Sequence, residues 1–314
     1  MEQTRRQRKK HERKKRIWIK GLLAILVILL AIGATQIPKI LSIFSTFDNV
    51  ELETGSKIPN TLGLLILGID NDGGEDIEVG HTDSITYIAA NLETKKAYAL
   101  PIYRDVQVSV SCDDGRDENI NRIYTQKGIE CLSQTVSDFL DLPIDNYAIL
   151  TMNGFVNIVN ELGGIELTPD ADFCSKYGLL SKKTEYCFTK GEQKEMPADE
   201  AIAYIRDRAN GSGAQRANRQ VQLIQAIKNK CLDNMLMCYQ KASPHFSGAF
   251  KTNIAPADIN QFTAVFGKEF ELGKLDVIEG VNEQTATGWT QFVDEEDKKT
   301  KTAIIRDEIF EGKT

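Results

Sequence analysis

Apolar residues are arranged in two different ways along this chain. Near the N-terminus, Ile17 to Ile37 is a single apolar segment of 21 residues that contains one charge, Lys20. About 20 residues of helix cross the core of a bilayer, so the segment predicts one membrane span at 17–37. From residue 61 onward the apolar residues come in short runs, which is typical of a globular domain.

The short runs alternate between strand and helix patterns. Strands are expected at 62–69, 84–91, 97–102, 106–110, 147–150 and 165–168. Helices are expected at 128–140, 153–162 (capped by Asn153), 197–205 and 217–230. Alternation of this kind predicts an α/β domain whose sheet is covered on both faces. No Gly/Ser-rich linker or repeat divides the later part of the chain. The expected organisation is a stub at 1–16, a span at 17–37, a linker at 38–60 and one domain at 61–314.

Charge supports an orientation for the predicted span. The first 20 residues hold ten Lys or Arg and two Glu, a charge of +8, so the total of −7 leaves −15 on the other 294 residues. Basic residues beside a span indicate its cytoplasmic end, which places the later domain outside the membrane. A cleaved signal peptide is the alternative, although Ile37-Pro38 makes a poor cleavage region. We expect contact of the stub with membrane lipid and no nucleic-acid binding.

Six cysteines all follow the predicted span. An even number on the outer side suggests disulfides in an oxidising compartment. Six cysteines allow 15 pairings, and we favour pairing of neighbours. A disulfide between Cys231 and Cys238 needs a break in the helix, because seven helical residues rise ~10.5 Å and bridged Cα atoms lie within about 7 Å. Zinc is disfavoured, since no CxxC motif occurs. The cysteines are Cys112, Cys131, Cys174, Cys187, Cys231 and Cys238.

Two pairs of charged residues adjoin the predicted strands. Asp70 ends the first strand and Asp83 lies at the start of the second, so two carboxylates near each other suit Mg²⁺, which takes oxygen ligands. Each Asp also fits a turn or a cap. Arg104-Asp105 follows the third strand directly. This second pair fits either a functional loop or an exposed salt bridge.

A cluster of arginines flanks a glycine-rich loop at the start of a predicted helix. Arg206 and Arg208 precede the loop, whereas Arg216 and Arg219 follow it. Arg216 and Gln220 are four residues apart and therefore share a helical face. The guanidinium fork matches phosphate oxygens, and the helix N-terminus adds positive potential. In an acidic domain this cluster indicates a phosphate or polyanion site, with a solvated charged face as the alternative.

Six motifs in this order resemble the LytR-CpsA-Psr family. The likeness covers about residues 61–245, and the expected N-terminal anchor also fits. Members of the family transfer glycopolymers such as teichoic acid or capsule from a polyprenyl-pyrophosphate carrier to peptidoglycan. The motifs are Leu64 to Asp70, His81-Thr-Asp-Ser84, Pro101-Ile-Tyr-Arg-Asp105, Asn119-Ile-Asn121, Gly163-Gly-Ile165 and Tyr204-x-Arg-x-Arg with Arg216-x-x-Arg-Gln220.

The resemblance implies a fold, partners and roles for individual residues. The fold is a three-layer α/β/α sandwich with a mixed sheet outside the cell membrane, and an apolar pocket between sheet and helices holds the prenyl chain. Asp70 and Asp83 would hold Mg²⁺ or Mn²⁺. The catalytic residues would be Arg104, Asp105, Arg206 and Arg208. The expected substrate-binding residues are His81, Arg104, Asn121, Arg206, Arg208, Arg216, Arg219 and Gln220.

The chain departs from the family pattern at two places. His81 stands where the family usually has Arg, so a fixed charge is replaced by a group that titrates. Gly213-Ala214-Gln215 stands where the family usually has Asp, an aromatic residue and Gly. These departures leave a second hypothesis, a catalytically weak protein that binds lipid-pyrophosphate in wall assembly or regulation. Pyrophosphate hydrolysis is a related activity, and a membrane-tethered transcription regulator is disfavoured because the stub has no DNA-binding fold.

Overall fold

The computed structural model describes most of the chain after residue 49. The described residues are 50–56, 58–70, 77–78, 80–176, 184–207, 213–231, 235–246, 248–255, 258, 265, 270–285 and 288–311. The predicted stub and span, together with Arg208, lie outside these residues. Among the described helices, none is both long and apolar enough to cross a bilayer. Thr46–Thr314 forms one compact unit.

A six-stranded mixed sheet is the centre of this unit. Its strand order is β11-β6-β1-β2-β3-β12. β1 is antiparallel to β2 and parallel to β6. Leu65, Leu67 and Ile69 of β1 are fully buried, as expected for a strand with layers on both sides. The strands are β1 (Thr61–Asp70), β2 (His81–Asn91), β3 (Lys96–Ile102), β6 (Asn146–Thr151), β11 (Phe250–Thr252) and β12 (Glu271–Lys274).

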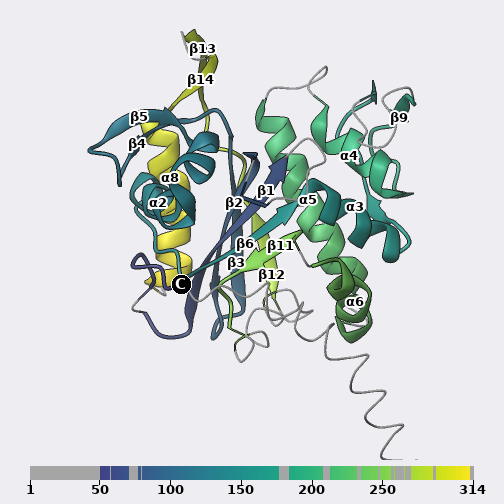
Figure 1. Ribbon diagram of the computed structural model, residues 1–314, viewed down its shortest axis with the longest axis horizontal. Helices are drawn as coiled ribbons and strands as arrows, with labels where there is room; N and C mark the ends of the chain where they lie inside the picture. The colour runs from purple at the N-terminus through teal and green to yellow at the C-terminus, as the bar shows by residue number, and fades with distance from the viewer. Residues whose placement is uncertain are drawn as a thin grey trace, which may run out of the picture. The chain divides into compact units, whose positions relative to one another are not determined.

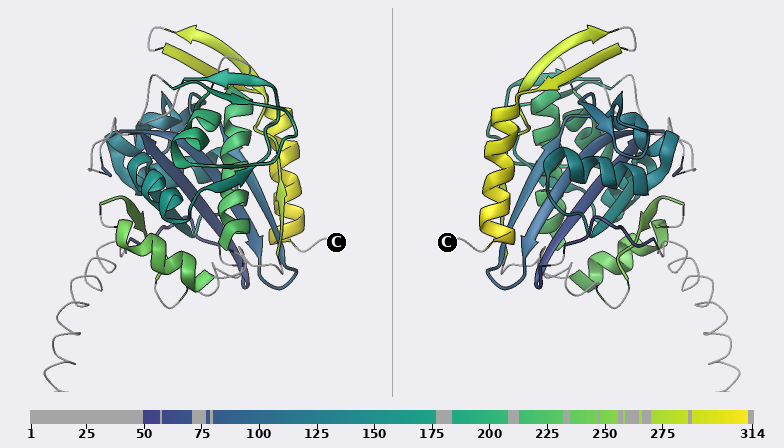
Figure 2. Two further views of the ribbon diagram at one scale, coloured as in Figure 1. Left: turned by 90° about the vertical axis from the view of Figure 1, so that its right-hand side faces the viewer. Right: turned by 90° about the vertical axis from the view of Figure 1, so that its left-hand side faces the viewer.

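Helices cover both faces of the sheet. α2 (Ile123–Leu140) and α8 (Glu295–Ile305) lie on one side of it, and α5 (Gly213–Cys231) lies on the other (Figure 1). The first face packs Leu132 and Val136 against the sheet, whereas the opposite face packs Val221 of α5. α4 (Ala198–Arg206) lies beside α5, and α3 (Met152–Glu161) lies beside α4 (Figure 2). The expectation of an α/β unit with a central mixed sheet is therefore confirmed.

Smaller elements complete the unit and lie mostly at its periphery. Three two-stranded ladders follow hairpin connections, and a fourth joins β7 to β10. The short helices are η1 (Ile120–Arg122), α6 (Met235–Ala242), η2 (Ser243–His245) and η3 (Arg306–Phe310). The short strands are β4 (Gln107–Val110), β5 (Arg116–Asn119), β7 (Ile165–Leu167), β8 (Phe173–Ser175), β9 (Tyr186–Phe188), β10 (Lys194–Met196), β13 (Gly280–Thr285) and β14 (Gly288–Val293).

The helices and strands expected from the sequence are found near their expected positions, with one correction to a helix cap. The cap of α3 is Thr151, whose hydroxyl accepts from the amide of Gly154, so the expectation of Asn153 as the cap is wrong. The residue just before the helix is the one whose side-chain oxygen can accept a hydrogen bond from a first-turn amide that has no partner within the helix. α2 is interrupted at Gly128, where φ is 83°, so the helix expected from Gly128 to Leu140 follows a short helical segment that begins at Ile123.

All three disulfides join neighbouring cysteines, as predicted. The pairs are Cys112–Cys131, Cys174–Cys187 and Cys231–Cys238. α5 ends at Cys231 and α6 starts at Met235, and the two bridged Cα atoms of this pair lie 5.7 Å apart. The predicted interruption of the helix is therefore confirmed.

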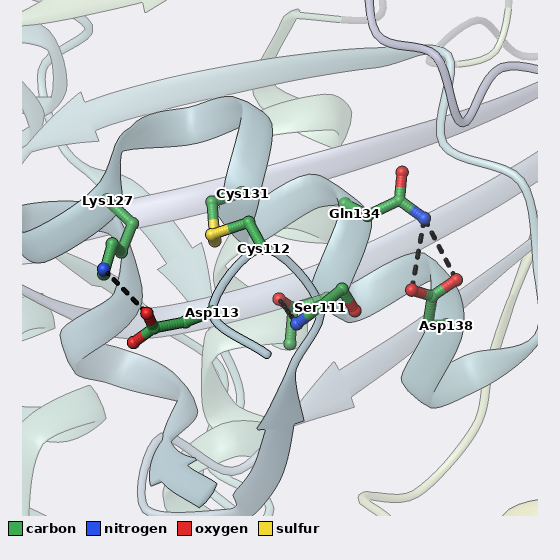
Figure 3. The surroundings of a disulfide bond; sticks show 8 residues. Ser111, Cys112, Asp113, Lys127, Cys131, Gln134 and Asp138 are labelled. Atoms are coloured by element: carbon green, nitrogen blue, oxygen red, sulfur yellow. Dashed lines mark hydrogen bonds and ion pairs between the residues drawn. A yellow bond between two sulfur atoms is a disulfide. The ribbon is translucent and has the colours of Figure 1, made fainter. Parts of the chain in front are cut away.

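The Cys112–Cys131 bridge ties the turn after β4 to α2 (Figure 3). The ion pair of Lys127 with Asp113, at 3.1 Å, lies next to it. A cavity of about 460 Å³ also adjoins the bridge. Three glutamates and Lys127 contribute to its lining, which does not match a prenyl chain. The expected apolar pocket stays a prediction.

Removal of the Cys112–Cys131 bridge should destabilise the fold without changing its architecture. The bridge closes a loop with a sequence separation of 19, and the entropy of such a loop in the unfolded chain corresponds to about 3 kcal/mol. We expect Cys112→Ala/Cys131→Ala to lower the free energy of unfolding by about 2–4 kcal/mol, measured by urea unfolding without reductant. Lys127→Ala removes only the adjacent ion pair and should cost less than about 1 kcal/mol. Equal losses in both variants would contradict this account.

Candidate active site

Two aspartates lie together where β1 ends and β2 begins. Asp70 is the last residue of β1 and is paired in register with His81, the first residue of β2. The register then shifts, because Ile69 pairs with Thr82 whereas Gly68 pairs with Ser84. Asp83 is thus the extra residue of a β-bulge. Bulges redirect side chains and are common beside active sites, and here the bulge sets the direction of the Asp83 carboxylate.

The Asp83 carboxylate binds two arginines from different parts of the chain. Arg104, in the loop after β3, donates from Nη1 to Oδ1 of Asp83. Arg216, in the first turns of α5, donates from Nη2 to Oδ2 at 3.2 Å. One turn further along α5, the amide of Gln220 donates to the backbone carbonyl of Asp83 at 3.3 Å. The predicted shared face of Arg216 and Gln220 is confirmed, and it faces the bulge.

Asp70 holds a third arginine. Arg206 is the last residue of α4, and its Nη2 donates to Oδ2 of Asp70 at 2.7 Å. The chain becomes extended at Asp207, immediately after Arg206. Three arginines from three separate elements therefore converge on two aspartates from adjacent strands. Asp105 adds a third carboxylate, which lies 3.4 Å from Nε of Arg104, so within the described residues three arginines face three carboxylates.

Backbone contacts fix the loop that bears Arg104. The amide of Asn121 donates to the carbonyl of Arg104 at 3.2 Å, and the hydroxyl of Thr82 donates to the carbonyl of Asn121 at 3.1 Å. Thr82 lies beside Asp83 in the bulge, so the same short chain of contacts holds both members of the ion pair. The Asn121 side chain is buried, and its structural role here comes from its backbone.

Burial and neighbouring charges have opposite effects on the pKa values of Asp83 and Arg104. Burial alone would raise the pKa of Asp83, but the positive charges of Arg216 and Arg104 hold that pKa below its ordinary value. Burial likewise opposes the charge on Arg104, and the nearby carboxylates of Asp83 and Asp105 more than compensate, so the pKa of Arg104 is raised. Asp83 and Arg104 therefore both stay charged at neutral pH.

Arg219 lies in a different network from the one expected. Its side chain is 1% exposed and donates from Nε to Oδ1 of Asp170 at 2.9 Å. The guanidinium packs over Phe173, 4.2 Å from the ring centroid, and over Tyr204 at 5.1 Å. These contacts bind α5 to α4 and to β8. Arg219 thus supports the two helices that present Arg206 and Arg216, whereas its expected contact with substrate stays a prediction.

Of two further residues expected in the site, the structure describes only His81. The side chain of His81 is exposed at the rim, next to the strand position of Asp70. Arg208 lies outside the described residues. Asp170 and Phe173 were not singled out by sequence reasoning. A buried arginine needs a carboxylate partner, but no local spacing of residues links Asp170 to Arg219.

Asp70 and Asp83 could supply some of the oxygen ligands of a divalent metal. Mg²⁺ in phosphate sites commonly takes one or two carboxylates and completes its shell with phosphate oxygens and water. Asp70 and Asp83 offer such oxygens on neighbouring strands. Across the described ranges no group of three or more His, Cys, Asp or Glu gathers as a metal site. The two carboxylates could fill only part of a coordination shell, and the expected Mg²⁺ or Mn²⁺ stays a prediction.

Comparisons with known proteins identify the family. The profile of the LytR_cpsA_psr family matches residues 44–306, so the chain belongs to this family. The polyisoprenyl-teichoic acid–peptidoglycan teichoic acid transferase TagT of Bacillus subtilis is 29% identical, over 73% of this chain and 74% of that protein. TagU of Bacillus cereus, which has the same descriptive name, is 27% identical over 92% and 95% of the two chains. The resemblance inferred from the six motifs is confirmed.

Solved structures share the fold. The crystal structure of B. subtilis TagV aligns with a TM-score of 0.65 and 24% identity, over 80% of this chain and 97% of that chain. A structure of TagT bound to LIIa-WTA aligns with a TM-score of 0.66 and 20% identity, over 83% of this chain and 99% of that chain. The mixed sheet and its covering helices are thus the fold of known members of the family.

The lowered pKa of Asp83 should make stability depend on pH. A carboxylate whose pKa is lower in the folded chain than its ordinary 3.8 stabilises the fold above that pH, and this stabilisation is lost as pH falls through the lowered value. The difference in unfolding free energy between wild type and Asp83→Asn should be constant from about pH 7 to 5 and shrink below about pH 4. Urea unfolding followed by circular dichroism measures it.

The matched control is Asp138→Asn, which changes an exposed carboxylate on α2. The free energy of unfolding of Asp138→Asn should differ little from that of the wild type at every pH. If the Asp83→Asn difference does not change between neutral and acid pH, the ion pairs do not hold the pKa of Asp83 down.

Proposed function

We propose that this chain is a membrane-anchored phosphotransferase that moves a glycopolymer from a polyprenyl-pyrophosphate carrier onto peptidoglycan. The observation that carries the proposal is the convergence of Arg104, Arg206 and Arg216 on two aspartates at one end of the sheet. Guanidinium groups bind phosphate oxygens in pairs. The names of TagT and TagU, polyisoprenyl-teichoic acid–peptidoglycan teichoic acid transferases, support a glycopolymer of the teichoic acid kind.

The proposed reaction is a displacement at phosphorus. A sugar hydroxyl of peptidoglycan attacks the phosphorus that bears the glycopolymer, and a new P–O bond forms. The bond from that phosphorus to the bridging oxygen breaks, and polyprenyl phosphate leaves with the electron pair. The hydroxyl proton passes to the leaving phosphate. The products are a phosphodiester between the two polymers and polyprenyl phosphate.

The arginines supply most of the proposed catalysis. Negative charge spreads over the non-bridging oxygens during the displacement, and fixed positive groups in a partly dry site stabilise that charge. Before substrate binds, Asp70 and Asp83 hold the arginines in place. Phosphate oxygens take over these partners on binding, so the arginines need little reorganisation. We assign Asp105 to orienting Arg104 from its Nε side, and accepting the hydroxyl proton is the alternative role.

The proposed anchor and metal complete the assignment. The span at 17–37 places the domain outside the membrane, next to a lipid carrier, with residues 1–16 in the cytoplasm. Asp70 and Asp83 would hold Mg²⁺, or Mn²⁺, against the pyrophosphate when the donor is bound. The metal would neutralise phosphate charge. His81, at the exposed rim, and Arg208 are assigned to the donor phosphates on the family pattern.

Loss of single arginines should abolish transfer and leave the fold intact. We expect Arg104→Ala and Arg206→Ala each to lower the transfer rate by about 10²–10³, measured as conjugate formed from a lipid-pyrophosphate donor and a glycan acceptor by the purified full-length chain. Arg104→Lys keeps a positive charge but not the fork, and should recover only part of the rate.

The matched control is Arg306→Ala, because Arg306 pairs at the surface with Asp141 away from the cluster. This variant should retain full activity. Near-normal conjugate formation by both Arg104→Ala and Arg206→Ala would refute the proposal. Donor binding without conjugate in the wild type would favour the alternative of a binding protein in wall assembly.

The proposed metal site makes a separate prediction. Mg²⁺ should raise the affinity of the chain for a non-reactive polyprenyl-pyrophosphate analogue, because Asp70 and Asp83 would hold the metal and its charge would favour phosphate binding. Asp70→Asn should remove this dependence on Mg²⁺. Titration calorimetry with and without Mg²⁺ measures both. An affinity in the wild type that is the same with Mg²⁺ and with a chelator would contradict the proposed metal site.

A further inference from the structure

Exposed hydrophobic side chains gather on one hairpin at the edge of the molecule. Of five large hydrophobic residues exposed in the described part of the chain, three lie on β13 and β14. Val281 is 64% exposed, Trp289 58% and Phe292 39%. A concentration of this kind on a surface element commonly marks a binding site.

The strand register divides these side chains between two faces of the hairpin. Trp289 pairs with Gln284, and Asn282 pairs with Gln291 two residues along, so these four share one face. Phe292 pairs with Val281 on the opposite face. Trp289, Gln284 and Asn282 are all exposed. The first face therefore combines an aromatic ring with two side-chain amides.

The base of the hairpin is fixed to the loop of the catalytic arginine. The amide of Gln291 donates to the carbonyl of Asp105 at 2.8 Å. Asn119 donates from Nδ2 to the carbonyl of Trp289 at 3.0 Å and accepts from the hydroxyl of Thr290 at 3.1 Å. Trp289 is two strand residues, or ~7 Å, from Gln291. The hairpin lies at the end of the sheet where β1 ends (Figures 1 and 2).

Charge on the hairpin argues against an anionic partner. Glu283 is the only charged residue in β13 and β14, and it is negative. Binding to phosphates or to an anionic lipid surface relies on Lys and Arg. An aromatic ring beside amides suits instead a neutral ligand with C–H groups on one side and hydroxyl or amide groups around its edge, which is the chemistry of a sugar ring.

We propose that the hairpin face formed by Asn282, Gln284 and Trp289 binds uncharged N-acetylhexosamine rings of the glycan acceptor. One sugar ring stacks on the indole of Trp289, and its acetamido and hydroxyl groups bond with the amides. The bound strand is thereby held next to Arg104, where its hydroxyl is to react. The proposal rests on the proposed function for the identity of the reaction, and assigns to this hairpin the substrate that the charged cluster does not bind.

Direct binding tests the subsite independently of any reaction. The chain has two tryptophans, Trp18 and Trp289, so full-length Trp18→Phe in detergent leaves Trp289 as the only indole. Chitotetraose should quench or blue-shift its emission in a saturable way. Gln284→Ala in this background should weaken the response by at least about tenfold. No saturable change at any soluble concentration of chitotetraose overturns the proposal.

Kinetics test whether the subsite serves the acceptor. Trp289→Ala should raise the KM for a glycan acceptor at least about tenfold, the loss expected of one aromatic anchor, with kcat and donor affinity little changed. Phe292→Ala is the matched control, because it removes an exposed aromatic ring from the opposite face of the same hairpin. It should leave the acceptor KM unchanged.

The outcomes separate this proposal from the proposed function. An equal rise in KM for Trp289→Ala and Phe292→Ala overturns the assignment of the face. Loss of vesicle binding or of self-association in Trp289→Ala, with the acceptor KM unchanged, assigns the hairpin to a membrane or to a second copy and also overturns it. If the wild type forms no conjugate but chitotetraose binds at Trp289, the proposed function fails and the sugar site stands.

Discussion

The carboxylate of Asp83 is the group on which the rest of the site depends. It binds Arg104 through one oxygen and Arg216 through the other, although those residues are 112 positions apart in the chain. Arg216 is 7% exposed in its side chain, and a buried guanidinium without a partner would cost several kcal/mol. Without Asp83 the two arginines would repel each other across a short distance. The carboxylate thus serves as the counter-ion that lets the cluster exist before any substrate is present.

The backbone at the start of β2 gives Asp83 its position. A regular antiparallel pairing of β1 and β2 would alternate side chains strictly between the two faces of the sheet. The bulge at Asp83 breaks that alternation where the sheet ends. The hydroxyl of Thr82 donates to the Asn121 carbonyl and the amide of Asn121 donates to the Arg104 carbonyl, so these bonds join the strand, η1 and the loop after β3. A short irregularity in one ladder therefore controls the geometry of charges from several elements.

Sequence reasoning located the parts of this site whose chemistry is local. Asp70, Asp83, Arg104 and the pair Arg216 and Gln220 stand beside recognisable strand ends and on one helix face, and the structure brings them together. Arg219 looked equivalent to Arg216, since both are arginines three residues apart on one helix. Only the fold distinguishes them, because Asp170, Phe173 and Tyr204 close around Arg219. Long-range partners of this kind leave no periodic signal.

The C-terminal elements were not predicted for the same reason. α8 is rich in charged residues and buries only Thr302 and Ile305, so its apolar stripe is too narrow to be recognised. The hairpin of β13 and β14 has no regular alternation of apolar and polar residues, and its apolar side chains are exposed. Its importance comes from its attachment to Asp105, which lies far away in the sequence.

A cluster of ion-paired arginines beside a hairpin with a single charged residue suggests how the proposed donor and acceptor are kept apart. Each of Arg104, Arg206 and Arg216 already has a carboxylate partner, so a neutral sugar would not bind them more strongly than that partner does. A pyrophosphate, with several negative oxygens, can compete for those arginines. The hairpin has the opposite preference and favours a sugar over pyrophosphate. Glu283 repels phosphate, whereas the indole of Trp289 can stack on a sugar ring. The proposed donor and acceptor would therefore each be disfavoured at the other's position, and selectivity would arise from charge before either substrate is recognised in detail.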